Sequence, residues 1–296
     1  MRILITGHAG FVGQHFWRAL ADDRHELNGF DIAVHELQDV RRMDMTPISA
    51  SSTPHYDLVI HCAAVVGGRR TIDGSPLAVA QNLAIDQALF AWALRARPGR
   101  ILYLSSSAVY PVSWQMGSLA GFRLPENAVD LSYMDCPDQT YGWAKLTGEM
   151  LAQHVAADGI PVHVVRPFSG YSADQSLDYP WPSFLARALR HDDPFDVWGD
   201  GLQVRDWIHI DDVIAGALAV VEQDVREPVN LCTGISTNFI ELARMFTRAA
   251  GYSAHIETKQ DEPTGVRYRV GDPTLMNTIY RPKITLEEAI AKAVRA

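Results

Sequence analysis

The chain has 296 residues, 47% of them hydrophobic and 21% charged, a composition typical of a globular protein with a large core. Its net charge of −9 at pH 7 argues against nucleic acid or an anionic membrane surface as the main partner. The three cysteines, Cys62, Cys136 and Cys232, follow no metal-ligand spacing, which argues against a zinc site and favours free thiols.

The N-terminal residues predict a strand and lack the charged and apolar regions of a signal peptide. The longest apolar run, residues 213–221, is shorter than the ~20 residues that a membrane-spanning helix needs. We therefore expect a cytoplasmic protein with no membrane partner, no nucleic-acid partner and no metal.

The first half of the chain alternates short apolar strands with helical patterns. Strands are predicted at residues 2–6, 26–30, 58–63, 100–105 and 162–167, and helices at residues 12–21, 82–96 and 141–157. Strand–helix alternation of this kind predicts an α/β fold in which helices cover both faces of a parallel sheet.

The alternation changes after Pro167. Prolines lead into a helical pattern at residues 178–190, and strand and helix patterns are mixed from there to the C-terminus. The sequence thus predicts one domain at residues 1–166 and a smaller mixed α/β region at 167–296. Part of residues 206–232, Val229 to Leu231 above all, is expected to return to the main sheet.

The segment TGHAGFVG, residues 6–13, joins the first strand to the first helix. Its glycines fit the dinucleotide-binding fingerprint: one makes a tight turn, one lets the backbone approach a pyrophosphate, and one allows close helix–sheet packing. A glycine-rich turn without a ligand is the alternative. The residues predicted to contact the cofactor here are Gly7, Ala9, Gly10, Phe11, Val12 and Gly13.

Asp31 ends the second strand, 18 residues beyond Gly13. A carboxylate at this position binds the adenosine ribose hydroxyls and repels a 2′-phosphate, which favours NAD over NADP. A helix cap or a solvated acid is the alternative. Asp44 and Met45 are further candidates for holding the adenine, although a loop aspartate can equally be structural.

Tyr141 and Lys145 are four residues apart in a helical pattern, so they share one helix face. A tyrosine has an ordinary pKa near 10, and acting as a base at neutral pH requires a pKa lower by about 3 units. A lysine one turn away and a positively charged nicotinamide would favour the phenolate. The segment LYLSSSAVYP adds a serine at the end of a strand, where α/β sites form.

In this order, TGHAGFVG, SSSAVYP, YGWAK and VRDWIHIDDV resemble the extended short-chain dehydrogenase/reductase family, and within it the nucleoside-diphosphate-sugar epimerases and dehydratases. The resemblance implies a Rossmann-type doubly wound domain that binds NAD and a smaller C-terminal domain that binds a nucleoside-diphosphate sugar. It also implies a homodimer formed through a four-helix bundle.

The resemblance also assigns roles to single residues. Tyr141 matches the general acid/base, Lys145 the ligand of the nicotinamide ribose, and Ser106 the catalytic serine, with Ser105 and Ser107 as neighbours in an uncertain register. The remaining matches are Ser105, Ala63, Ala64 and Pro167 for the cofactor, Ser107, Arg205 and Arg267 for the substrate, and Arg269 as a second choice to Arg267.

Two departures narrow the expected reaction. No acidic residue follows the catalytic serine, where Ser107 and Ala108 stand, and the segment DYPWPSFL has no histidine. The residues support redox chemistry at one sugar carbon, most simply a 4-epimerase acting through a transient 4-keto sugar. The alternatives are a net 4-dehydrogenase or 4-ketoreductase, a dehydratase that recruits acids from elsewhere, and a non-catalytic NAD-sensing scaffold.

Overall fold

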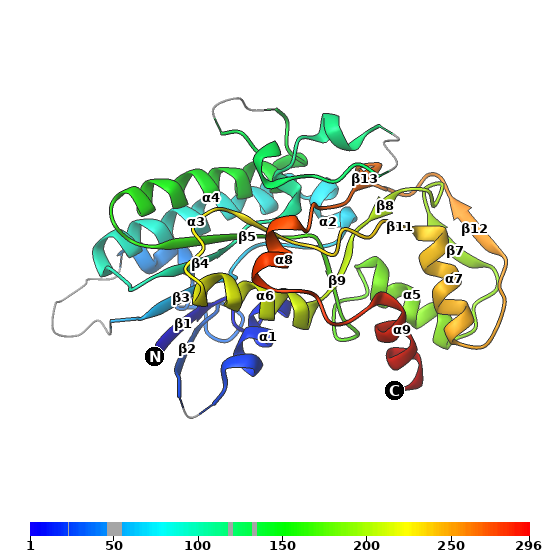
Figure 1. Ribbon diagram of the computed structural model, residues 1–296, viewed down its shortest axis with the longest axis horizontal. Helices are drawn as coiled ribbons and strands as arrows, with labels where there is room; N and C mark the ends of the chain where they lie inside the picture. The colour runs from blue at the N-terminus through cyan, green and yellow to red at the C-terminus, as the bar shows by residue number, and fades with distance from the viewer. Residues whose placement is uncertain (23, 46–54, 118–120, 132–134) are drawn as a thin grey trace.

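The computed structural model describes residues 1–22, 24–45, 55–117, 121–131 and 135–296, apart from the side chains of Asp44 and Met45. A six-stranded sheet forms the centre of the larger region, and a smaller helical region with short strands lies beside it (Figure 1). The strands of the large sheet are β1 (Arg2–Thr6), β2 (Glu26–Phe30), β3 (Leu58–His61), β4 (Ile101–Leu104), β5 (Val162–Pro167) and β10 (Val229–Leu231).

All neighbouring strands in this sheet pair in parallel, in the order β10-β5-β4-β3-β1-β2. The chain moves from β1 outward to β2 and then back across β1 to β3, so the order reverses between β1 and β3. Ligands of open α/β sheets bind outside the carboxyl ends of strands at such a reversal. The predicted α/β fold with a doubly wound parallel sheet is confirmed, and β10 pairs with β5.

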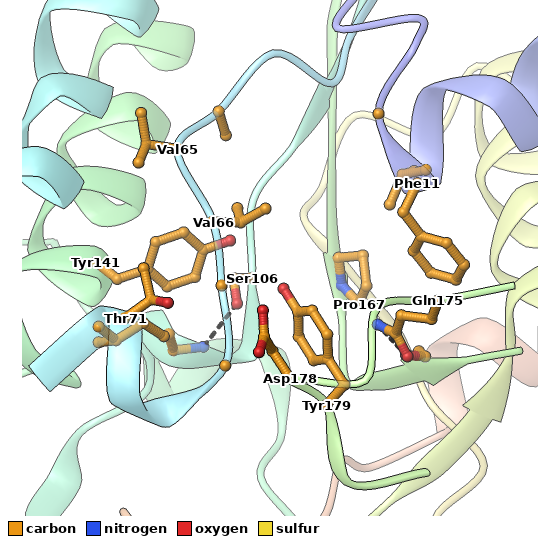
Figure 2. Close-up of a pocket in the computed structure, with 18 of the residues that line it drawn as sticks. Phe11, Val65, Val66, Thr71, Ser106, Tyr141, Pro167, Gln175, Asp178 and Tyr179 are labelled. Atoms are coloured by element: carbon orange, nitrogen blue, oxygen red, sulfur yellow. Dashed lines mark hydrogen bonds between the residues drawn. The ribbon is translucent and has the colours of Figure 1, made fainter. Parts of the chain in front are cut away.

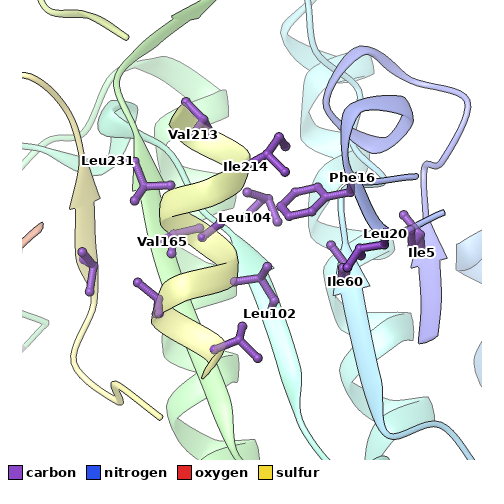
Figure 3. Close-up of a cluster of buried hydrophobic side chains, with 14 of the residues drawn as sticks. Ile5, Phe16, Leu20, Ile60, Leu102, Leu104, Val165, Val213, Ile214 and Leu231 are labelled. Carbon is purple, nitrogen blue, oxygen red and sulfur yellow. The ribbon is translucent and has the colours of Figure 1, made fainter. Parts of the chain in front are cut away.

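One face of the sheet is covered by α1 (Phe11–Leu20) and α6 (Ile210–Glu222). Side chains alternate between the faces of a strand, so Ile3 and Ile5 point to this side and Leu4 to the other. Figure 3 shows the resulting core, in which Phe16 of α1 and Ile214 of α6 lie over the sheet.

The other face is covered by α3 (Pro76–Ala96) and α4 (Gln139–Ala157), which pack on each other and on the short helices η1 (Val40–Met45) and α2 (Arg69–Gly74). By length and composition, α3 could cross a membrane, a test that core helices also pass. Its buried residues include Asn82 and Asp86, whose side chains bond to groups of the surrounding protein.

Two elements have other boundaries than the sequence predicts: helix α3 and strand β3. Helix α3 begins at Pro76 and not at residue 82, because proline suits the first turn, where its missing N–H has no intrahelical acceptor. Strand β3 ends at His61, and Cys62 and Ala63 leave the sheet to line a cavity. The earlier end of β3 places Ala63 and Ala64 in a loop at the sheet edge.

The C-terminal region has its own aromatic core between α5 (Pro180–Leu189), α7 (Phe239–Ala249) and α9 (Leu286–Arg295). Three small sheets accompany them: β11 (Thr237–Asn238) with β8 (Val204–Arg205) and β13 (Tyr268–Arg269), β12 (Ile256–Lys259) with β7 (Phe195–Trp198), and β6 (Ser169–Tyr171) with β9 (Trp207–His209). The remaining elements are η2 (Ser107–Val109), η3 (Val112–Gln115), η4 (Glu126–Ala128) and α8 (Thr274–Ile279).

A buried ion pair fixes α4 to the sheet. The Arg166 guanidinium on β5 donates to both carboxylate oxygens of Glu149 on α4, at 2.9 and 2.7 Å, and both side chains are almost fully buried. The Ser105 hydroxyl, just after β4, also donates to Glu149. Arg166 gives its remaining bonds to the Tyr110 hydroxyl and the Glu126 carbonyl.

Removing the Glu149 carboxylate would leave the Arg166 charge buried without its partner. We expect Glu149→Ala to lower the free energy of unfolding by about 3–5 kcal/mol, measured by urea denaturation. Asp158→Ala is the control, because the Arg97–Asp158 pair lies on the surface and its loss should cost less than about 1 kcal/mol. Equal losses in the two variants would contradict this account of Glu149.

Candidate active site

A cavity of about 770 Å³ opens along the carboxyl ends of the sheet strands and continues between the sheet and the C-terminal region. The predicted residues that line it are Gly7, Ala9, Gly10, Phe11, Val12, Gly13, Asp31, Ala63, Ala64, Ser105, Ser106, Tyr141, Lys145, Pro167 and Arg205. Figure 2 shows part of this wall, with Phe11 and Pro167 on one side and Tyr141 on the other.

The fingerprint loop forms a cradle that only glycine allows. Gly7 has a φ of +69°, and a β-carbon there would lie 2.6 Å from the Ala63 backbone. A β-carbon at Gly13 would overlap the Gly7 carbonyl. Helix α1 follows with Gly10 as its N-cap and no side-chain capping bond, so its first N–H groups can bind the pyrophosphate of NAD.

Asp31 stands at the end of β2 with its carboxylate on the cavity wall. It accepts the Ala9 N–H at 2.9 Å and the Ala33 N–H at 2.8 Å, which hold the carboxylate beside the fingerprint loop. This position fits the predicted contact with the adenosine ribose hydroxyls.

The side chains of Asp44 and Met45 lie outside the described residues, so their predicted contact with the adenine stays a prediction. The cavity wall near Asp31 also includes Asp39, Val40 and Arg41. The Arg41 guanidinium donates to both carboxylate oxygens of Asp39. The sequence analysis missed these residues. The only sequence feature that could have indicated them is the acidic–apolar pair Asp39–Val40, eight residues after Asp31.

Ser106 and Tyr141 meet on the cavity wall. Ser106 is the N-cap of η2, where its hydroxyl accepts the Ala108 N–H, and the Tyr141 ring points toward it from α4 (Figure 2). Both side chains line the cavity. The Ser105 hydroxyl is instead bonded to Glu149, and Ser107 is buried outside the cavity lining, so Ser106 is the serine beside the tyrosine.

The predicted lowering of the Tyr141 pKa relies on Lys145 together with a positively charged nicotinamide; in the protein alone, the pKa of Tyr141 is raised. Burial raises the pKa of Tyr141 to about 12; the Ser106 hydroxyl opposes that rise, and the Asp86 carboxylate adds to it. The physical reason is desolvation of the phenolate, together with a buried negative charge that the sequence analysis did not place near Tyr141.

Three arginines from distant segments converge at the far end of the cavity. Arg69 and Arg269 both bind the Asp138 carboxylate, at 3.0 and 2.8 Å, and Arg69 also pairs with Asp73. The described hydrogen bonds of Arg205 all go to backbone carbonyls, and burial and the charge of Arg269 lower its pKa. The guanidinium groups outnumber the carboxylates, so the cluster is suited to binding an anion.

Arg267 is not brought to this cavity. It pairs with Asp200 at a smaller hollow, just before β13 begins, whereas Arg269, within β13, lines the cavity. The structure thus places Arg269, the second choice, on the cavity, and the substrate contact predicted for Arg267 stays a prediction.

Other residues on the wall were missed. Asp178 and Tyr179 point into the cavity near Ser106 and Tyr141 (Figure 2). Asp138 was also missed. In the sequence it stands where a helix N-cap is expected, directly before the helix that carries Tyr141, but in the structure its side chain makes no capping bond. It binds arginines from distant segments instead, and the neighbouring sequence does not indicate such a contact. In the described part of the chain, no group of acidic, histidine or cysteine side chains could hold a metal.

Residues 3–232 match the model of the NAD dependent epimerase/dehydratase family. The chain therefore belongs to that family: it is an enzyme, and its cofactor is NAD.

Three relatives illustrate the similarity. GDP-mannose 3,5-epimerase 1 of Oryza sativa subsp. indica is 30% identical, over 93% of this chain and 75% of its own. The dTDP-4-dehydro-6-deoxy-D-allose reductase of Streptomyces sp is 26% identical, over 94% and 90%. The crystal structure of UDP-glucose 4-epimerase from Thermotoga maritima with UDP-glucose has a TM-score of 0.83 and 23% identity, covering 100% of this chain and 98% of that one.

If the arginine cluster binds an anion, Arg269→Met should weaken the binding of nucleoside diphosphates. Loss of a charged hydrogen-bond donor costs about 1.5–3 kcal/mol, which corresponds to a roughly 10- to 100-fold higher Kd. Calorimetric titration with UDP and with GDP measures it. Arg267→Met is the matched control and should leave Kd within about threefold, as surface changes do; a larger effect of Arg267→Met would contradict the assignment.

Proposed function

We propose that this enzyme is an NAD-dependent 4-epimerase of a nucleoside-diphosphate sugar, acting through a transient 4-keto sugar. The observation that carries the proposal is the position of Ser106, Tyr141 and Lys145 on one wall of a cavity that extends from the fingerprint loop to the arginine cluster. A ligand that reaches from a dinucleotide to the arginines must pass the tyrosine hydroxyl.

In the proposed reaction, the Tyr141 hydroxyl oxygen takes the proton of the sugar 4-hydroxyl and later returns it. Ser106 holds the reacting oxygen in place, because its hydroxyl lines the cavity beside the Tyr141 ring. NAD, when bound, accepts a hydride and gives it back. Epimerisation then requires that the keto sugar turn within the cavity before the hydride returns.

The proton transfer needs the phenolate of Tyr141, which burial disfavours. The Lys145 ammonium lies one helical turn away, and a positively charged nicotinamide ring would stabilise the phenolate further. We therefore expect the rate of sugar oxidation to rise with pH as the phenolate fraction increases.

The arginine cluster is the proposed seat of the substrate diphosphate. Arg205 is half-buried, its charge is not paired to a carboxylate among the described residues, and Arg269 flanks it. Farther along the cavity, Gln203 and Trp207 each have a buried polar atom without a described partner. A nucleotide with hydrogen-bonding groups would complement these atoms.

A net 4-ketoreductase or 4-dehydrogenase is the second candidate. The similarity to the Streptomyces reductase favours it, and the same three residues would serve it. The two candidates differ in whether NAD is regenerated in each cycle, which depends on the turning of the keto sugar and not on the proton-transfer residues.

The test is incubation with UDP-, GDP-, dTDP- and CDP-sugars, with products followed by mass spectrometry and NMR. We expect an isomer of unchanged mass, inverted at C4, without net consumption of NAD. A loss of two hydrogens would establish the dehydrogenase, a loss of water a dehydratase, and inversion at another carbon would contradict the assignment of C4.

The same assay applied to the Tyr141→Phe variant tests the proposed role of the tyrosine hydroxyl. It removes the hydroxyl and keeps the ring, so turnover should fall by about 10²–10⁴-fold with little change in substrate affinity. Ser106→Ala, which removes only a positioning bond, should cost less. Near-normal turnover by Tyr141→Phe would contradict the proposed role of this residue.

We also propose a homodimer through α3 and α4. Apolar side chains exposed on these two helices support it: Leu77, Leu83, Leu94, Trp143 and Met150. A second copy could cover them in a four-helix bundle.

Trp143→Glu would place a carboxylate in that interface and should convert a dimer into a monomer, measured by sedimentation at micromolar concentration. Trp114→Glu is the matched control, because Trp114 has similar exposure, 43% against 42%, and lies on η3. A monomeric unmodified protein would contradict the proposal.

A further inference from the structure

A chain of buried polar side chains crosses the carboxyl end of the sheet beneath the active site. Thr6 at the end of β1 lies 2.7 Å from His61 Nδ1 at the end of β3, and His61 Nε2 lies 3.0 Å from Asp86 on α3. The Tyr103 hydroxyl on β4 reaches the other oxygen of Asp86 at 2.5 Å. All four residues are at most 1% exposed.

The carboxylate fixes the direction of these bonds. Asp86 keeps a lowered pKa: burial raises it, but Lys145, His61 and Tyr103 together outweigh burial. An ionised carboxylate only accepts, so His61 must donate through Nε2 and accept from Thr6 through Nδ1. Burial lowers the pKa of His61, in agreement with a neutral ring, and raises that of Tyr103, which keeps its proton to donate.

This chain ends under a catalytic residue. The Lys145 ammonium lies 5.0 Å from the centre of the Tyr103 ring, and Lys145 is only 3% exposed. On the next turn of α4, a β-carbon at Gly148 would overlap the Tyr103 hydroxyl, so glycine is needed for the helix to pack against the Tyr103–Asp86 bond. Asp86 itself lies outside the cavity lining.

We propose that Asp86, held in place by Tyr103 and His61, is a positioning residue whose charge keeps the Lys145 ammonium beside Tyr141 and balances it. This inference rests on the proposed role of Tyr141 in proton transfer. A buried ammonium without a counter-charge is costly, and Asp86 supplies that charge from a position fixed by its hydrogen bonds with His61 and Tyr103. Burial raises the pKa of the Tyr141 phenol, and the same carboxylate adds to that rise.

Other titratable groups face this site from each packed element. They are His61 and Cys62 beside β3, Tyr103 on β4, Lys145 and Glu149 on α4, and Tyr179 beside α5. Glu149 is held in its own ion pair with Arg166, so Asp86 is the carboxylate whose neutralisation should act most directly on Lys145 and Tyr141.

The first test titrates the Tyr141 phenol in the NAD complex, without any sugar. The ultraviolet absorbance change of each protein is compared with the same protein carrying Tyr141→Phe, so that the difference isolates one phenol. Asp86 raises the pKa of Tyr141. In Asp86→Asn the titration step should therefore move to lower pH, by roughly one unit.

Tyr103→Phe is the matched control, because it removes one hydrogen bond and keeps the Asp86 charge and the ring under Lys145. Its titration step should move less than that of Asp86→Asn. An unmoved step in Asp86→Asn, or an equal shift in Tyr103→Phe, would overturn the proposal and leave Asp86 a packing residue.

A double-mutant cycle covers the case in which Asp86→Asn folds poorly. If Asp86 balances Lys145, the Asp86→Asn/Lys145→Met double variant should resist urea better than Asp86→Asn alone, since no buried ammonium is left unpaired. Additive losses of stability would overturn the proposal. Neither test uses a nucleotide sugar, so a failure here is distinct from a failure of the proposed 4-epimerase activity.

Discussion

The parallel direction of all six strands is the constraint on which the site depends. In a parallel sheet, every strand delivers its carboxyl end to the same edge, whatever lies between the strands in sequence. The fingerprint glycines after β1, the alanines after β3 and the serines after β4 therefore meet along one cavity. The reversal of strand order between β1 and β3 opens the crevice at this edge, where a dinucleotide can enter.

Helix α4 presents the proposed proton-transfer residues to the cavity because of their four-residue spacing. Tyr141, Lys145 and Glu149 are four residues apart, so all three lie on the helix face that meets the sheet. Lys145 and Glu149 are buried charges, and each is satisfied by another element: Glu149 by Arg166 on β5, and Lys145 by its position over Tyr103, near Asp86. A slip of the helix would break both arrangements, and the charges thus fix where the Tyr141 hydroxyl points.

The arginine cluster at the opposite end of the cavity is built from residues far apart in the sequence. Arg69 follows β3, Asp138 precedes α4, Arg205 lies on β8 and Arg269 on β13, so the cluster draws on the whole length of the chain. One carboxylate holds two of the guanidinium groups in position, and carbonyl oxygens hold the third. The protein fixes the geometry of these donors while leaving positive charge for a ligand, which is a form of preorganisation.

The sequence by itself determined what depends on local pattern: the strand–helix alternation, the glycines of the fingerprint loop, the acid at the end of β2, and Tyr141 with Lys145 on one helix face. Each follows from a backbone requirement or a helical period that operates within a few residues. Only the tertiary structure showed that Ser106 lies beside Tyr141, that Arg269 and not Arg267 lines the cavity, and where Asp86 and Asp138 lie. These assignments depend on which side chains meet across elements and on desolvation, which raises the pKa of Tyr141 although Lys145 lies one turn away. Charges and burial act through space, and a sequence pattern records neither distance nor solvent exclusion.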